Sequence, residues 1–174
     1  MMFFPIFVVD FINNVGYKNT LPWNISSEIQ YCRFIIKKNI LIVGYSTFLS
    51  IKGSFLKNCF LIIMSRKKNV SIINYFFSGG VFFSLLLCLS LFKKIILLKL
   101  RNKNFLYVYL IGGISIYKFF FPFCNLFYVT YIYGNFLGNS FFYFFRFFFF
   151  KKKFFYFFKN FVFKIYLKKC FFLI

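Results

Sequence analysis

The chain has 174 residues, enough for one domain with a sizeable core, and 61% of them are hydrophobic, including 36 Phe, while His is absent. Lys and Arg total 23 against two acidic residues, yet no basic-region helix, zinc finger or RNP-like pattern accompanies the net charge of +21, so we expect no specific nucleic-acid binding. The dominant residues (Phe, Ile, Leu, Lys, Asn and Tyr) have AT-rich codons, and we attribute the composition mainly to a nucleotide-biased genome, in which residues that run against the bias are the most informative.

Short apolar runs, bounded by Gly, Asn or basic residues, predict buried strands of the parallel type. They lie at 5–9, 39–44, 60–64, 106–111 and 126–132. From residue 141 onward the chain has the Phe/Lys bias of a low-complexity tail, except for an edge strand predicted near 161–169.

Helices are predicted between these strands. The first begins at about Ser26, with Ser26 or Ser27 as its cap and Gln30 completing a capping box. Two more are predicted at 46–51 and 115–121. Strands that alternate with helices predict an α/β domain with a mostly parallel central sheet and about four flanking helices.

The stretch 70–92 carries no charge and has basic residues on both sides, which by length and hydropathy is also typical of a transmembrane helix. Gly79 and Gly80 divide it into a β-branched, aromatic half and a helix-like half, which instead indicates a strand followed by a helix. This stretch alone leaves both interpretations open.

The five Cys form no C-x-x-C pair, and with no His in the chain we expect no metal site. An odd number of Cys and an N-terminus without a basic signal-peptide region favour a reducing, cytoplasmic location.

The segment LPWNISSEIQ (21–30) holds the only Trp, Trp23, and one of the two acidic residues, Glu28. Glu28 falls in the first turn of the predicted helix and shares a face with Cys32 and Ile35, where an apolar environment would raise its pKa. First-turn acids are common because they complement the helix dipole, and Glu28 alone is better explained in that way.

Three turns follow predicted strands: Gly44 before Ser46 and Thr47, Ser65 before Arg66, and the pair Gly112 and Gly113. At the carboxyl ends of parallel strands, such turns offer backbone N–H groups and hydroxyls to the phosphates of a nucleotide.

Taken in order and spacing, NNVGYKNTLPWNISSEI, NILIVGYSTFLSI, LIIMSR, YLIGGISIYKFFFP and LFYVTYIYGNFLGNSFF resemble the dihydrofolate reductase family. The resemblance covers 6–66 and 105–144 closely, and it implies one domain over 1–174 that reduces dihydrofolate to tetrahydrofolate with NADPH, as a monomer without a membrane span. An integral membrane protein, or a decayed reductase with the fold but little activity, remain the alternatives.

The resemblance also implies site residues. Glu28 corresponds to the acid that binds the pterin and supports protonation at N5, Thr130 to the Thr that supports this acid, and Trp23 to a residue of the loop over the nicotinamide. The implied substrate-binding set is Ile6, Val8, Glu28, Cys32, Ile51, Leu56, Lys57 and Thr130. The implied cofactor-binding set is Val8, Asn14, Val15, Gly16, Leu21, Trp23, Gly44, Ser46, Thr47, Ser65, Arg66, Ile111, Gly112, Gly113, Ile114, Ser115, Ile116 and Tyr117.

The chain departs from the family pattern at several positions. Cys59 stands where the family has an Arg for the folate glutamate, with Lys57 nearby as a substitute, and Tyr45 replaces a basic residue. Cys32 and Asn139 replace an aromatic and an acidic residue. These departures bear on folate affinity more than on the type of reaction.

Overall fold

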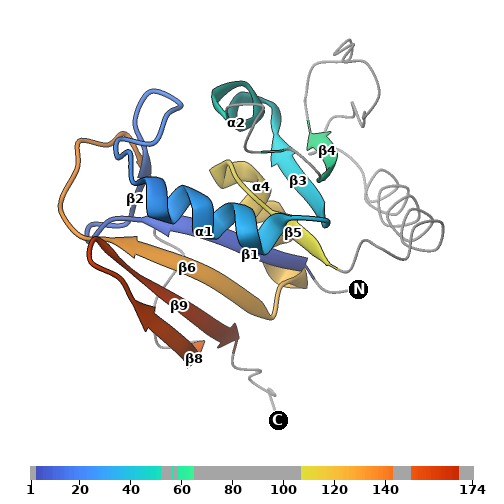
Figure 1. Cartoon of the computed structure of the whole chain (residues 1–174). Coiled ribbons are helices and arrows are strands. Elements are labelled where there is room, and N and C mark those ends of the chain that lie inside the picture. The colour runs from blue at the N-terminus through green and yellow to red at the C-terminus, as the bar shows by residue number, and fades with distance from the viewer. Residues whose placement is uncertain (1–2, 52–55, 57–58, 65–106, 143–149, 169–174) are drawn as a thin grey trace.

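The structure is a computed structural model that describes residues 3–51, 56, 59–64, 107–142 and 150–168. Within these residues the main sheet has seven strands in the order β4-β3-β5-β1-β6-β9-β8, and a small second sheet pairs β2 with β7 (Figure 1). The strands are β1 (Phe3–Val9), β2 (Asn14–Gly16), β3 (Ile40–Gly44), β4 (Phe60–Met64), β5 (Val108–Leu110), β6 (Leu126–Ile132), β7 (Ser140–Phe141), β8 (Phe150–Phe157) and β9 (Phe161–Lys168).

The central strands are parallel and the last two are antiparallel. β1 pairs in parallel with β5 and β6, and β3 pairs in parallel with β4 and β5. β9 runs antiparallel to both β6 and β8. Because the parallel strands share one direction, the loops that follow β1, β3, β5 and β6 leave the same edge of the sheet.

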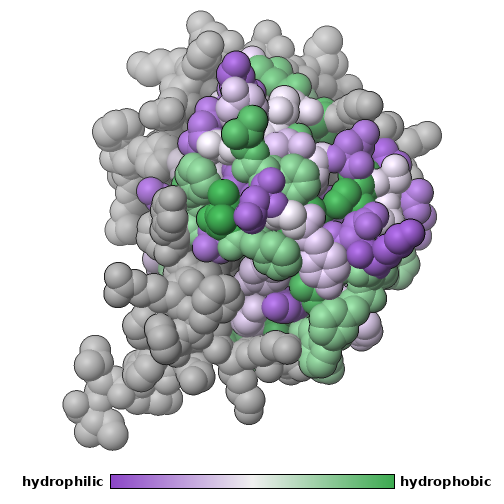
Figure 2. Space-filling view, turned by 90° about the vertical axis from the view of Figure 1, so that its left-hand side faces the viewer, coloured by the Kyte–Doolittle hydropathy of each residue, from purple (hydrophilic) through white to green (hydrophobic). Residues whose placement is uncertain are grey.

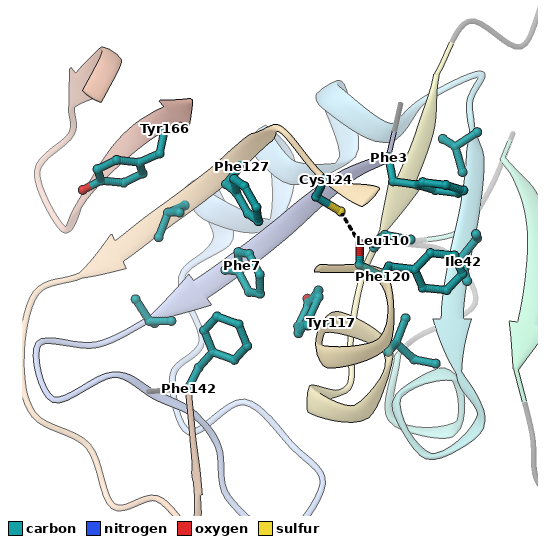
Figure 3. Packing of buried hydrophobic residues seen from close by; sticks show 14 of the residues in the cluster. Phe3, Phe7, Ile42, Leu110, Tyr117, Phe120, Cys124, Phe127, Phe142 and Tyr166 are labelled. Carbon is teal, nitrogen blue, oxygen red and sulfur yellow. Dashed lines mark hydrogen bonds between the residues drawn. The ribbon is translucent and has the colours of Figure 1, made fainter. Parts of the chain in front are cut away.

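Each face of the sheet is covered by its own apolar cluster. On one face α1 (Ser26–Ile36) packs Cys32 and Ile36 against Ile6 of β1, and on the other α4 (Ile114–Phe120) packs Phe120 against Phe3. Successive side chains of a strand point to opposite faces, which explains why β1 supplies both clusters. Figure 3 shows Phe7, Tyr117, Phe127 and Phe142 gathered on the α4 side.

Most predicted elements of the well-matched region are present. β4 and β6 have the predicted bounds, while β1, β3 and β5 differ from the prediction by one or two residues at their ends. The described helices are α1, α2 (Tyr45–Ser50), α4 and the 3-10 turn η2 (Phe121–Phe123). The mostly parallel α/β sheet is therefore confirmed.

Two predictions were wrong. Ile25, with extended backbone, is the N-cap of α1, so Ser26 and Ser27 lie inside the first turn and no side chain caps the helix. The tail is not only low complexity: β8 forms within it by pairing with β9, so the strand predicted at the edge near 161–169 lies between β6 and β8, and β8 is the edge strand of the described sheet. Its register with β9 is irregular between Lys152 and Phe154.

No helix within the described ranges is long and apolar enough to cross a membrane. The stretch 70–92, for which a membrane span and a strand-helix pair were both considered, lies outside the described residues.

Asn39 stabilises the end of the sheet opposite the loops that follow β1, β3, β5 and β6. Its buried amide donates to the carbonyls of Ile35 (3.2 Å) and Lys37 (3.0 Å), and its Oδ1 accepts the N–H of Tyr107 (2.8 Å). We expect Asn39→Ala to lower the free energy of unfolding by about 1–3 kcal/mol, because the Tyr107 N–H loses its partner. Urea denaturation measures this, with the exposed Asn24→Ala as control, and equal stabilities of the two variants would contradict it.

Candidate active site

The turn after β3 lies directly against the turn after β5. The Gly44 N–H donates to the Gly112 carbonyl at 2.8 Å, and a Cβ added to Gly44 would lie 3.3 Å from the Gly113 nitrogen. The Gly112–Gly113 peptide bond is cis. Side chains on these glycines would therefore press into the neighbouring turn. The two turns can lie this close together because glycine has no side chain.

Thr47, in the first turn of α2, faces the glycine pair. Its Oγ1 would lie 3.2 Å from a Cβ added to Gly113 and 3.6 Å from one added to Gly112. This hydroxyl makes no hydrogen bond to another described residue, and Ser46 beside it is exposed. The hydroxyl of Thr47 and the backbone of Gly112 and Gly113 thus form a small polar cradle.

Tyr117 connects α4 to β1 beneath this cradle. Its hydroxyl donates to the Ile6 carbonyl at 2.6 Å, and its ring centroid lies 4.2 Å from that of Phe7 (Figure 3). Burial raises the pKa of Tyr117 well above its usual value, so the phenol stays protonated as a donor. The bond fixes the position of α4, whose Ile116 side chain would lie 3.3 Å from a Cβ on Gly44.

Glu28 lies in the first turn of α1 but is only 3% exposed. Burial raises the pKa of its carboxyl from 4.5 to about 7. The helix N-terminus opposes this shift and is worth about 0.3–1 kcal/mol, whereas a shift of this size corresponds to about 3 kcal/mol. Desolvation therefore dominates, and the interpretation of Glu28 as an ordinary solvated first-turn acid is wrong.

The surroundings of Glu28 are apolar. Cys32 follows one turn later on the same helix, and burial, followed by the nearby charge of Glu28, raises the pKa of its thiol. Thr130 is buried on β6 opposite Val8 of β1, and no hydrogen bond joins it to Glu28 within the described part of the chain. Among the described residues, the carboxyl thus has no polar partner that would favour its ionised form.

Trp23 closes the site beyond the carboxyl end of β1. It is buried with Ile132 and Phe161, with Val8 packed against this cluster, and its ring meets that of Phe136 edge-on at 5.4 Å. The indole Nε1 is buried and has no hydrogen-bond partner among the described residues. A buried N–H without a partner costs free energy unless something else accepts its hydrogen bond.

The structure brings most of the predicted site residues into these groups. Ile6, Cys32, Ile51 and Leu56 belong to one apolar cluster with Ile111, and Cys59 packs against it, with its thiol 3.4 Å from the Ile36 carbonyl. Asn14 and Gly16 are buried in β2, and Val15 packs against the cluster on the α4 side. Ile114 is half-buried, whereas Leu21 and Ser115 are exposed.

Three predicted site residues, Lys57, Ser65 and Arg66, lie outside the described residues. Two residues that sequence reasoning did not place near the site do belong to its surroundings, namely Asp10 and Phe136. The rarity of acids in this chain, which singled out Glu28, could also have drawn attention to Asp10. No signal in the sequence marks Phe136 among 36 Phe.

Comparison with known proteins decides the family. The family model described as dihydrofolate reductase matches residues 2–154. The chain belongs to the dihydrofolate reductase family. It is 30% identical over 128 residues to the dihydrofolate reductase of Staphylococcus haemolyticus, an alignment that covers 74% of this chain and 68% of that one. It is 28% identical to that of Buchnera aphidicola subsp. Baizongia pistaciae, with 74% and 69% coverage.

A solved structure supports the same fold. Dihydrofolate reductase from Enterococcus faecalis, complexed with NADP(H) and RAB-propyl, superposes with a TM-score of 0.69 at 18% identity and covers 97% of both chains. The fold therefore agrees with the family, and the membrane-protein alternative is not favoured.

Proposed function

We propose that the chain transfers a hydride from NADPH to 7,8-dihydrofolate, with a proton delivered to N5, as a cytoplasmic monomer that feeds one-carbon and thymidylate metabolism. The observation that carries this proposal is the burial of Glu28, which raises the pKa of its carboxyl to about 7. A group with that pKa is in part protonated and in part ionised at neutral pH, as proton delivery requires.

Glu28 binds the pterin through its carboxyl and supports the arrival of the proton at N5. Thr130, on β6, supports the carboxyl of Glu28 when substrate is bound. The cluster of Ile6, Cys32, Ile51 and Leu56 forms an apolar wall. The wall keeps water from solvating the carboxylate, which is the cause of its raised pKa. Lys57 binds the outer, carboxylate end of the folate.

NADPH supplies the hydride chemistry when it is bound. The residues present fit such a dinucleotide: Gly112 and Gly113 have no side chains of their own, and the Thr47 hydroxyl beside them makes no hydrogen bond to another described residue, so it can serve as a donor. The buried Trp23 indole offers one further N–H without a partner. Ser46, Ser65 and Arg66 bind the phosphates, and Leu21 and Trp23 cover the nicotinamide end.

NADPH binding alone tests the cofactor half of the proposal. We expect saturable quenching of the lone Trp23 by NADPH, and binding about 10- to 100-fold weaker for NADH, which lacks the 2′-phosphate that Ser65 and Arg66 would hydrogen-bond. Fluorescence titration of the refolded protein gives both constants. Quenching that does not saturate, or equal affinities for the two nucleotides, would contradict this assignment.

The activity itself is tested by dihydrofolate-dependent oxidation of NADPH, with an antifolate as control. The proposal predicts oxidation that depends on both substrates and stops when the antifolate is added. Saturable NADPH binding without any oxidation would instead support a decayed reductase, the alternative that the departures at Cys59 and Tyr45 motivate.

A further inference from the structure

Asp10 is the second of the two acids in this chain, and it is completely buried at the end of β1. Its Oδ1 accepts the backbone N–H groups of Ile12 (3.0 Å) and Asn14 (2.9 Å). Its Oδ2 accepts the N–H of Phe136 at 3.1 Å, across 126 residues of sequence. One carboxylate therefore joins the loop after β1 to the loop after β6.

The same two loops are joined by further hydrogen bonds. The Asn14 amide donates to the Phe136 carbonyl at 3.4 Å, while its Oδ1 accepts the Gly16 N–H within β2 at 2.9 Å. The Asn139 N–H donates to the Gly16 carbonyl at 3.1 Å. A Cβ on Gly138 would overlap the Asn14 amide, so the loops are in close contact here.

Phe136 connects these hydrogen bonds to Trp23. Its backbone is held by Asp10 and Asn14, while its ring packs edge-on against Trp23 with the ring centroids 5.4 Å apart. Trp23 is 7% exposed, and its indole N–H has no partner among the residues described. The place at which that N–H is presented to a ligand therefore depends on where Phe136 is held.

We propose that Asp10 is a positioning residue for the site: its carboxylate fixes the Phe136 backbone, and the Phe136 ring sets the orientation of Trp23. Asp10 acts through Phe136 and does not touch substrate. The catalytic part of this inference rests on the proposed reductase function, whereas the effect on Trp23 does not. This role needs both oxygens of the carboxylate as acceptors, because one accepts from the loop after β1 and the other from the loop after β6.

The substitution Asp10→Asn tests this proposal. It replaces one carboxylate oxygen by an NH2 group, which is a donor and can no longer accept the N–H of Phe136. We expect the emission of Trp23, the only Trp, to shift and its quenching by acrylamide to increase in the folded, ligand-free protein. We also expect kcat to fall about ten- to a hundredfold, with a smaller change in the KM for dihydrofolate. Phe136→Leu retains the backbone donor and loses the ring, and it should give the same spectral change.

Asn39→Ala is the matched control, because it removes a buried polar side chain with three backbone contacts at the opposite end of the sheet. It should lower stability without changing the spectrum of Trp23 or kcat. A wild-type Trp23 spectrum in Asp10→Asn, or an equal change in Asn39→Ala, would overturn the proposal. If Asp10→Asn does not fold, Phe136→Leu decides: an unchanged spectrum in that variant overturns the proposal. If the wild type shows no reductase activity, the fluorescence comparison still decides it.

Discussion

Replacing Glu28 by Gln should lower kcat for dihydrofolate reduction at neutral pH by about a hundredfold or more. General acid-base groups contribute about 10²–10⁴-fold to rates, and Glu28 is buried beside Cys32, which belongs to the apolar cluster under α1. The amide has nearly the same shape but cannot supply or accept the proton. The loss should be largest where proton delivery limits the rate, and single-turnover kinetics at several pH values measures it.

Glu28→Asp is the control for this experiment, because it keeps a carboxyl group in the same turn of α1. We expect Glu28→Asp to retain much more activity than Glu28→Gln, while both bind NADPH with wild-type affinity. Unchanged rates across pH in Glu28→Gln would show that the role assigned to this residue is wrong.

Glu28→Gln should also increase the free energy of unfolding at alkaline pH relative to the wild type. The carboxyl has a pKa of about 7 in the folded protein and 4.5 as its reference value, so the native state binds the proton more tightly. Stability from this group is complete below about pH 4.5 and is lost as the pH rises through 7, by on the order of 3 kcal/mol in total. Glu28→Gln removes that loss, because an amide does not ionise.

Urea unfolding of the wild type and of Glu28→Gln between about pH 5 and pH 8 tests the sign. The chain contains no His, so no imidazole titrates in this range and obscures the result. We expect the difference in free energy of unfolding to grow in favour of the variant as the pH rises. A constant difference between the two proteins would mean that Glu28 is not buried as described.

The parts of the fold that could be predicted from sequence are those in which local pattern and tertiary context agree. β4 and β6 are continuous apolar runs between clear breaks, and they have the predicted bounds. β8 could not be predicted, because its order depends on β9 and its own residues are the Phe and Lys that the composition supplies everywhere.

The candidate site, too, could be predicted only where the local sequence pattern and the tertiary context agree. Glu28 was found because acids are rare in this chain and because the surrounding segment resembles a family, but its burial is a tertiary property that no local pattern contains. In isolation the first-turn position favoured the opposite interpretation. The contact of Phe136 with Trp23 joins residues far apart in sequence, and only the fold shows it.

Glu28 and Cys59 mark contrasting ends of the proposed folate site. The pterin end has its acid, whereas at the glutamate end the Cys59 thiol lies 3.4 Å from the Ile36 carbonyl. Burial raises the pKa of Cys59, so this thiol is neutral and offers no charge to a carboxylate. We therefore expect the glutamate tail to depend on Lys57.

The most direct test of the central claim is the pH dependence of dihydrofolate-dependent NADPH oxidation by the wild-type protein. If the buried carboxyl of Glu28 supports proton delivery, the rate constant should be highest below about pH 7 and should fall as the pH rises through the pKa of about 7. A rate that does not change across this range, or that follows the same profile in Glu28→Gln, would contradict the account.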